Sequence, residues 1–153
     1  MKGLTAMLEE ITPGNGYQHD LRGRVFRGRI LFGTSDPLPL VALLEPPLPI
    51  DQIIARGDPA LSTGDWEIMV QGFVDDDPTH PLDPAYRLVA DVRKRLALAA
   101  RDGAETYDYG LPAVTGMSVG PGVVRPSDDI SARAYFWLSL RLKIAEDMAD
   151  PYL

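Results

Sequence analysis

The sequence predicts an α+β fold in which helices pack on a mostly antiparallel sheet. Three observations lead to this prediction: a long segment with the apolar period of a helix, several segments that alternate with the period of a strand, and connections too short for repeated βαβ units. The chain has 153 residues, of which 45% are hydrophobic. This length and composition suit one domain with its own core, so we expect a single domain over residues 1–153.

The first predicted element is a short N-terminal amphipathic helix. Leu4, Met7, Leu8 and Ile11 recur at helical spacing, and Pro13 ends the pattern.

A longer helix is predicted at about residues 84–101. Asp83 followed by Pro84 is typical of an N-cap and a first helical position, and Gly103 is expected to stop the helix. The apolar stripe contains Leu88, Val89, Val92, Leu96 and Ala99. The polar residues expected to face water are Arg87, Asp91, Lys94, Arg95 and Arg101.

The first strand is predicted over residues 24–32, where Phe26, Ile30 and Phe32 share one face. The turn sequence at 33–39 leads to a second strand at 40–45, which is apolar on both faces and therefore central. We expect these two strands to form a hairpin.

Residues 46–65 are expected to form a connection with at most a brief helical turn at 50–56. Three regions after it alternate as strands do, and the first is a strand predicted at 66–74. Residues 113–126 predict two short strands around a turn at 120–122. The longest alternating pattern runs from Ala134 to Ile144 and predicts the last strand.

Composition narrows the function. The chain has no cysteine, which excludes disulfides, thiolate metal sites and a cysteine nucleophile. Its net charge is −7, with 22 acidic against 15 basic residues, so binding of nucleic acid over the whole surface is not expected. No apolar run approaches the roughly 20 residues of a membrane-spanning helix, and the start lacks the apolar region of a secretory signal. We expect assembly in a cytoplasm and no contact with a membrane.

Four arginines lie close together in the acidic chain: Arg22, Arg24, Arg27 and Arg29. On a strand they divide between both faces, which favours a solvated face or salt bridges between subunits over a phosphate contact. On the last strand, Tyr135 and Trp137 stand among polar residues. They indicate either a subunit interface or a second covered face of the sheet.

Other motifs favour ordinary loops. The segment "DDDPTHP" at 75–81 has three aspartates and His80 but lacks the spacing of a calcium loop. The glycines of "GMSVGPG" at 116–122 precede a strand rather than a helix, which is typical of turns rather than of a phosphate site. Neither His19 nor His80 accompanies a nucleophile motif, so the residues predict no catalytic, cofactor or metal site.

Four segments in their order resemble the small tail terminator or tail-completion proteins of long-tailed bacteriophages and prophages. They are "GYQHDLRGRVFRGRILFG", "DPLPLVALLEPP", "WEIMVQGFVDDD" and "VVRPSDDISARAYFWLSLRLKI". The likeness lies in segment order and covers most of the chain.

The resemblance implies a virion protein of the tail or neck that assembles in the host cytoplasm. It implies a ring, usually of six copies, that caps the tail tube, with three partners: other copies of itself, the tail tube protein, and the head-tail connector or stopper protein. It also implies that DNA passes through the lumen without specific binding, which suits an acidic ring because like charges repel. The family has no cofactor and no catalytic residues to carry over.

A closed ring needs two different patches on each subunit. We expect them at the arginine strand with its following loop and at the Tyr135 face. The candidate interface residues are Arg22, Arg24, Arg27, Arg29, Asp36, Tyr135, Trp137 and Arg141.

Three alternatives remain open. A head-closure or connector protein at the same junction would follow the twelvefold portal ring. A small hydrolase or regulator would gather His19 or His80 with a carboxylate and a serine in a pocket. A single-stranded nucleic-acid binder would lose affinity steeply with salt.

Overall fold

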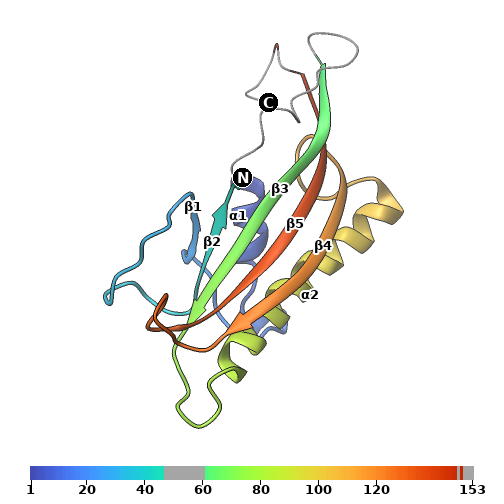
Figure 1. Cartoon of the computed structure of the whole chain (residues 1–153). Coiled ribbons are helices and arrows are strands. Elements are labelled where there is room, and N and C mark those ends of the chain that lie inside the picture. Colours follow the sequence, from blue (N-terminus) through green and yellow to red (C-terminus); the bar gives the residue numbers. More distant parts are fainter. Residues whose placement is uncertain (47–60, 148, 150–153) are drawn as a thin grey trace.

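The computed structural model describes residues 1–46, 61–147 and 149, and it confirms the α+β prediction (Figure 1). The elements in these residues are α1 (Lys2–Glu9), the 3-10 helix η1 (Pro13–Asn15), β1 (Val25–Arg27), β2 (Leu40–Leu44), β3 (Leu61–Val74), α2 (Asp83–Thr106), β4 (Val114–Arg125) and β5 (Ala134–Asp147). The five strands form one sheet in the order β1-β2-β3-β5-β4. All neighbouring pairs are antiparallel except β1 and β2, which are parallel.

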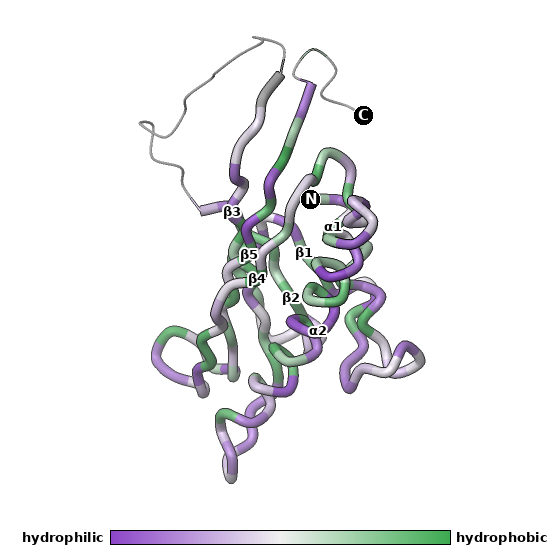
Figure 2. Tube along the Cα trace, turned by 90° about the vertical axis from the view of Figure 1, so that its right-hand side faces the viewer, coloured by the Kyte–Doolittle hydropathy of each residue, from purple (hydrophilic) through white to green (hydrophobic). Residues whose placement is uncertain are grey.

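Helices α1 and α2 cover the same face of the sheet, and within residues 1–46 and 61–147 no helix covers the other face (Figures 1 and 2). The hydrophobic core lies between the helices and the sheet. Its members alternate along the strands and recur every three or four residues along the helices, as the sequence predicts; they include Leu4, Leu8, Val41, Leu43, Val70, Leu88, Val92, Leu96, Phe136, Leu138 and Leu140.

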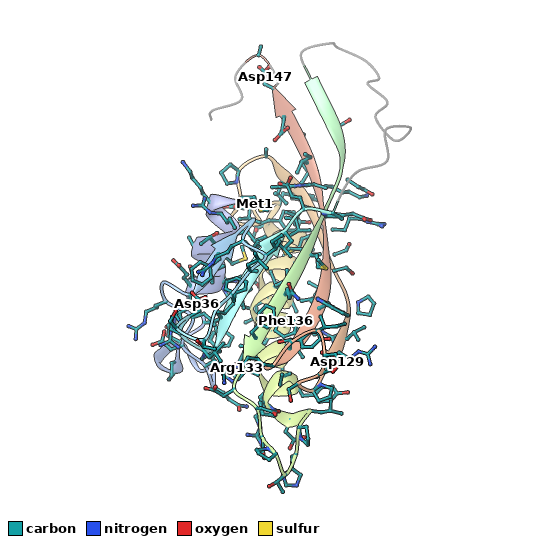
Figure 3. The ribbon with its side chains drawn as sticks, turned by 60° about the vertical axis from the view of Figure 1, so that its left-hand side comes forward. Met1, Asp36, Asp129, Arg133, Phe136 and Asp147 are labelled. Atoms are coloured by element: carbon teal, nitrogen blue, oxygen red, sulfur yellow. The ribbon has the colours of Figure 1, made fainter. Side chains whose placement is uncertain are left out.

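Phe136, at the middle of the sheet, lies over a glycine of the neighbouring strand (Figure 3). Gly72 is its register partner in β3, and a Cβ atom at this glycine would lie 2.0 Å from the Phe136 ring. The absence of a side chain at Gly72 therefore makes room for the Phe136 ring in the core.

The predicted first strand and hairpin are wrong. The strand covers only residues 25–27, because Gly28 has a left-handed φ of 66° that turns the chain away from the sheet. The loop 28–39 then carries the chain back to the start of β2, which runs parallel to β1. The alternation of Phe26, Ile30 and Phe32 thus indicated an apolar side rather than a continuing strand.

The connection predicted up to residue 65 ends earlier than expected. Residues 61–65 belong to β3, where they pair with the end of β5. Beyond the reach of β2 and β4, β3 and β5 continue as a two-stranded end, at which Asp147 lies (Figure 3). The helical turn predicted at 50–56 lies outside the described residues.

The long helix is confirmed, but its boundaries shift. Leu82 is the N-cap, Asp83 is already helical, and the helix continues to Thr106 before Tyr107 adopts a left-handed φ of 59°. Gly103 does not end the helix. It is buried inside it, where the ring of Tyr109 packs so closely that a Cβ atom would clash.

Residues 114–125 form one strand instead of two short strands around a turn. The register with β5 shifts between Val119 and Gly122, so the predicted turn is a bulge within β4. The pairing with β5 on both sides of the bulge keeps the strand continuous.

Candidate functional site

Five aromatic rings form a row across the helix-free face of the sheet. Successive ring centroids lie 5.6, 5.5, 6.1 and 5.2 Å apart, within the range of favourable aromatic pairs. The row consists of Phe26, Phe32, Phe73, Tyr135 and Trp137. An antiparallel sheet with one solvated face normally presents polar side chains there, so this apolar row is unusual for a face that no described helix covers.

The loop 28–38 forms one side of a groove above this row. The Arg29 guanidinium lies 5.0 and 4.7 Å from the ring centroids of Phe26 and Phe32 and forms a 2.8 Å ion pair with Asp36. The same aspartate accepts a 2.7 Å hydrogen bond from the backbone N–H of Gly33. This amide and then Arg29 lower the pKa of Asp36. The contacts fix the loop on the sheet.

The loop 126–133 forms the opposite side and is organised in the same way around Asp128. Its carboxylate accepts hydrogen bonds from the Tyr135 hydroxyl at 2.8 Å and from the backbone N–H groups of Ile130 and Ser131 at 2.8 and 3.0 Å. These donors, with Tyr135 first, lower the pKa of Asp128. Burial and then the Asp128 hydrogen bond raise the pKa of Tyr135.

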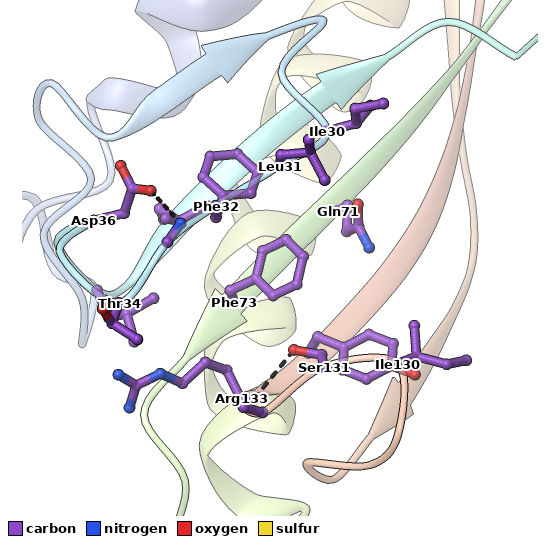
Figure 4. Close-up of a pocket in the computed structure, with 15 residues that line it drawn as sticks. Ile30, Leu31, Phe32, Thr34, Asp36, Gln71, Phe73, Ile130, Ser131 and Arg133 are labelled. Carbon is purple, nitrogen blue, oxygen red and sulfur yellow. Dashed lines mark hydrogen bonds between the residues drawn. The ribbon is translucent and has the colours of Figure 1, made fainter.

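Between the two loops lies a groove of about 310 Å³ with Phe73 at its floor (Figure 4). Tyr135 also lines this groove. Three aliphatic side chains stand beside it in solvent: Ile30 is 70% exposed, Leu31 80% and Ile130 77%. Because both loops are held by ion pairs and hydrogen bonds, these side chains are kept outside the core by fixed structure. Their arrangement is typical of a protein-docking surface.

The four arginines do not form a common basic patch. Arg22 forms an ion pair with Asp20 in a turn before β1, and it lowers the pKa of that carboxyl to about 2. Arg24 donates to the backbone carbonyl of Leu38 at 2.6 Å, while Arg27 is exposed at the end of β1. Arg29 is the member that helps to build the groove.

The candidate residues of β5 also separate. Tyr135 is buried beneath the loop 126–133 rather than beneath a helix. Trp137 is half-buried at the end of the aromatic row, and Arg141, farther along the strand, pairs with Glu67 of β3. Of the candidate residues, Asp36 and Tyr135 therefore line the groove, and Arg29 contacts two lining residues, Phe32 and Asp36. The others lie outside the lining: Arg22, Arg24, Arg27, Trp137 and Arg141.

A buried carboxylate that the sequence prediction placed in water lies on the other side of the molecule. Asp91 is 5% exposed, and one of its oxygens accepts from the backbone N–H groups of Gln18 and His19 and contacts His19 Nδ1 at 2.8 Å. Its position next to the stripe residues Leu88 and Val92 was the available signal. This contact fastens residues 18–19 to α2.

The acidic loop 75–82 is organised by pairwise contacts. Asp75 pairs with Arg133, Asp76 accepts from the Ser127 hydroxyl, and Asp77 accepts from the backbone of the following turn. Within residues 1–46 and 61–147, no three histidine or acidic side chains converge as metal ligands would.

Neither a protein-family model nor a curated protein matches this sequence. Among the helices that the structure describes, none combines the length and the apolar character needed to cross a membrane.

Proposed function

We propose that this chain is a structural subunit that assembles with copies of itself into a ring, usually of six, and caps the tail tube of a long-tailed phage at the junction with the head connector. The observation that carries the proposal is the groove on the helix-free face, where an aromatic row lies between two fixed loops with exposed aliphatic residues. Exposed apolar surface of this kind is typical of sites that another protein covers in an assembly.

The contacts of the histidines and of the aspartates beside the groove are structural, which supports a role in assembly rather than in catalysis. His19 holds the N-terminal segment on α2 through Asp91, and His80 stands exposed in the loop 75–82, near Asp77. The aspartates beside the groove hold its two loops in place. The order of the segments supplies the phage-tail context by resemblance.

The proposal is tested by polymerising purified tail tube protein of the same phage with increasing amounts of this chain. Capping predicts shorter tubes with the added protein at one end, seen by negative-stain microscopy with a gold-labelled tag. Ile130→Glu, which places a charge beside the groove, should lose the effect, and Tyr107→Glu, at an 89% exposed position, should retain it. Unchanged tube lengths with no end-bound protein would contradict the proposal.

A further inference from the structure

Asn15 is the only asparagine in the chain, and a glycine follows it. It ends the 3-10 helix η1 and is exposed, in the loop 12–20 between α1 and β1. An asparagine before a glycine is prone to deamidation, because no Cβ atom on the next residue shields the side-chain amide from that residue's backbone nitrogen. Gly16 has a left-handed φ of 81°, where any other residue would be strained. The turn therefore requires the glycine that makes Asn15 reactive.

The folded loop restrains both groups that must react. Asn15 Nδ2 donates a 2.8 Å hydrogen bond to the Glu10 carbonyl, five residues back along the chain, and the Gly16 backbone N–H donates to the Pro13 carbonyl at 3.1 Å. Ring closure needs the Gly16 nitrogen to lose this proton and the Asn15 side chain to turn toward that nitrogen. Both hydrogen bonds must break first, so the reaction proceeds from an opened loop.

The contacts of the loop with α2 determine how readily it opens. Lys94 Nζ donates to the Gly16 carbonyl at 2.8 Å and lies 4.7 Å from the centroid of the Tyr17 ring. At the base of the loop, the Leu21 backbone N–H donates to the Ile11 carbonyl at 2.9 Å, and both side chains are buried in the core. The outer part of the loop depends on exposed polar contacts, which can break without global unfolding.

We infer that Asn15 is a spontaneous modification site, whose deamidation is limited by opening of the loop 12–20 and whose product keeps this loop loose. The Gly16 nitrogen, after losing its proton to hydroxide, forms a bond to Asn15 Cγ. The Cγ–Nδ2 bond then breaks, and the departing nitrogen takes a proton from solvent and leaves as ammonia. Water opens the resulting succinimide at either carbonyl, which gives aspartate or isoaspartate. The net reaction consumes one water and releases one ammonia, so it needs no other reactant.

The product lacks the contact that held the amide. A carboxylate has no N–H to donate, so it would place an oxygen against the Glu10 carbonyl oxygen at the distance of the lost hydrogen bond. Isoaspartate adds a methylene to the backbone of η1. Either product adds a negative charge to a chain whose net charge is already −7. The inference uses none of the groove residues and is independent of the proposed function.

Intact-mass spectrometry and peptide mapping measure the reaction while the parent chain is incubated in mildly alkaline buffer, with and without urea. Because two hydrogen bonds must break in the folded chain, the product at Asn15 should form at least about tenfold faster in urea. Release of ammonia should follow the same time course. Asn15→Gln should form no product at this position, since its longer side chain would have to close a larger ring.

Lys94→Ala tests whether α2 controls the opening. It should speed deamidation of the folded chain severalfold while the melting temperature stays close to that of the parent, because Lys94 is exposed. Arg101→Ala is the matched control, since this exposed residue of the same helix pairs with Asp102, and it should leave the rate unchanged. Asn15→Asp supplies one product directly. It should lower the melting temperature by roughly 2–4 °C and speed hydrogen exchange of the Tyr17 amide.

Three results would overturn the inference. Equal rates of deamidation with and without urea would show that the folded loop does not restrain Asn15. Equal rates in the parent and Lys94→Ala chains would show that α2 does not control the opening. An Asn15→Asp chain with the melting temperature and the amide exchange of the parent would show that the product does not loosen the loop. Capping of tail tubes decides the proposed function separately, and none of these results bears on it.

Discussion

Replacing the buried Asp91 by alanine should destabilise the protein more than replacing an exposed aspartate of the same helix. The substitution removes one carboxylate oxygen that accepts hydrogen bonds from two backbone N–H groups, at 2.9 and 3.0 Å, and contacts the His19 ring at 2.8 Å. These contacts join residues 18–19 to α2 across more than seventy positions of sequence. Nothing else of comparable burial and charge holds this segment among the described residues.

The magnitude follows from the contacts. A hydrogen bond to a charged group contributes about 1.5–3 kcal/mol, and these three share one acceptor, so their contributions do not add fully. Water also reaches the vacated site because Gln18 is exposed. The higher helix propensity of alanine returns roughly 0.5 kcal/mol. We expect a net loss of about 2–3 kcal/mol for Asp91→Ala and about half of that for Asp91→Asn, which keeps one acceptor oxygen.

Thermal unfolding monitored by circular dichroism measures this loss. For a chain of this size, about 2–3 kcal/mol lowers the melting temperature by roughly 5–10 °C. Asp102→Ala is the matched control, because this aspartate lies on the same helix, is exposed and pairs with Arg101. The reasoning fails if the Asp91→Ala and Asp102→Ala chains melt within about 2 °C of each other, or if exchange of the Gln18 and His19 amides is unchanged.

Three further predictions concern the core and the groove. Gly72→Ala should cost about 2 kcal/mol or more in chemical unfolding because its Cβ meets the Phe136 ring, whereas Gly64→Ala in the same strand, with nothing within 4 Å, should be neutral. The pKa of Asp128 is lowered in the folded protein, so the stability that its charged carboxylate contributes is fully present above about pH 4 and is lost as pH falls through the folded pKa. NMR titration of this carboxyl group should show a midpoint below the ordinary value of about 3.9. Arg29→Ala should speed amide hydrogen exchange in the loop 28–38 with little change in the melting temperature; unchanged exchange would mean that the stacked guanidinium does not order this loop.

The elements that the sequence predicted well are those with a long apolar period. The alternation from Ala134 to Ile144 identified β5, and the stripe from Leu88 to Ala99 identified α2, because many residues repeat one pattern. The strand at 40–44, apolar on both faces, lies inside the sheet as expected. In these elements, the faces that are buried require apolar residues, so the apolar pattern in the sequence reports the structure directly.

The errors arise where one residue or one long-range contact decides. The left-handed φ of Gly28 ends β1, although the side chains after it continue to alternate. The parallel pairing with β2 depends on the path of a loop, which local periodicity does not encode. Asp91 is buried because distant backbone amides bind it. The sequence predicted part of the candidate site, namely Arg29, Asp36 and Tyr135. It did not predict that Phe32, Phe73 and the loop 126–133 come together with them, because these segments meet only in the folded chain.

Native mass spectrometry over a concentration series, with images of the largest species, tests the central claim that the groove drives assembly of this chain. The account predicts that the parent chain forms a closed ring of one stoichiometry with an open centre, and that Leu31→Glu remains monomeric at the same concentrations while it melts at the same temperature. A parent chain that stays monomeric throughout, or a Leu31→Glu chain that forms the same rings, would contradict it.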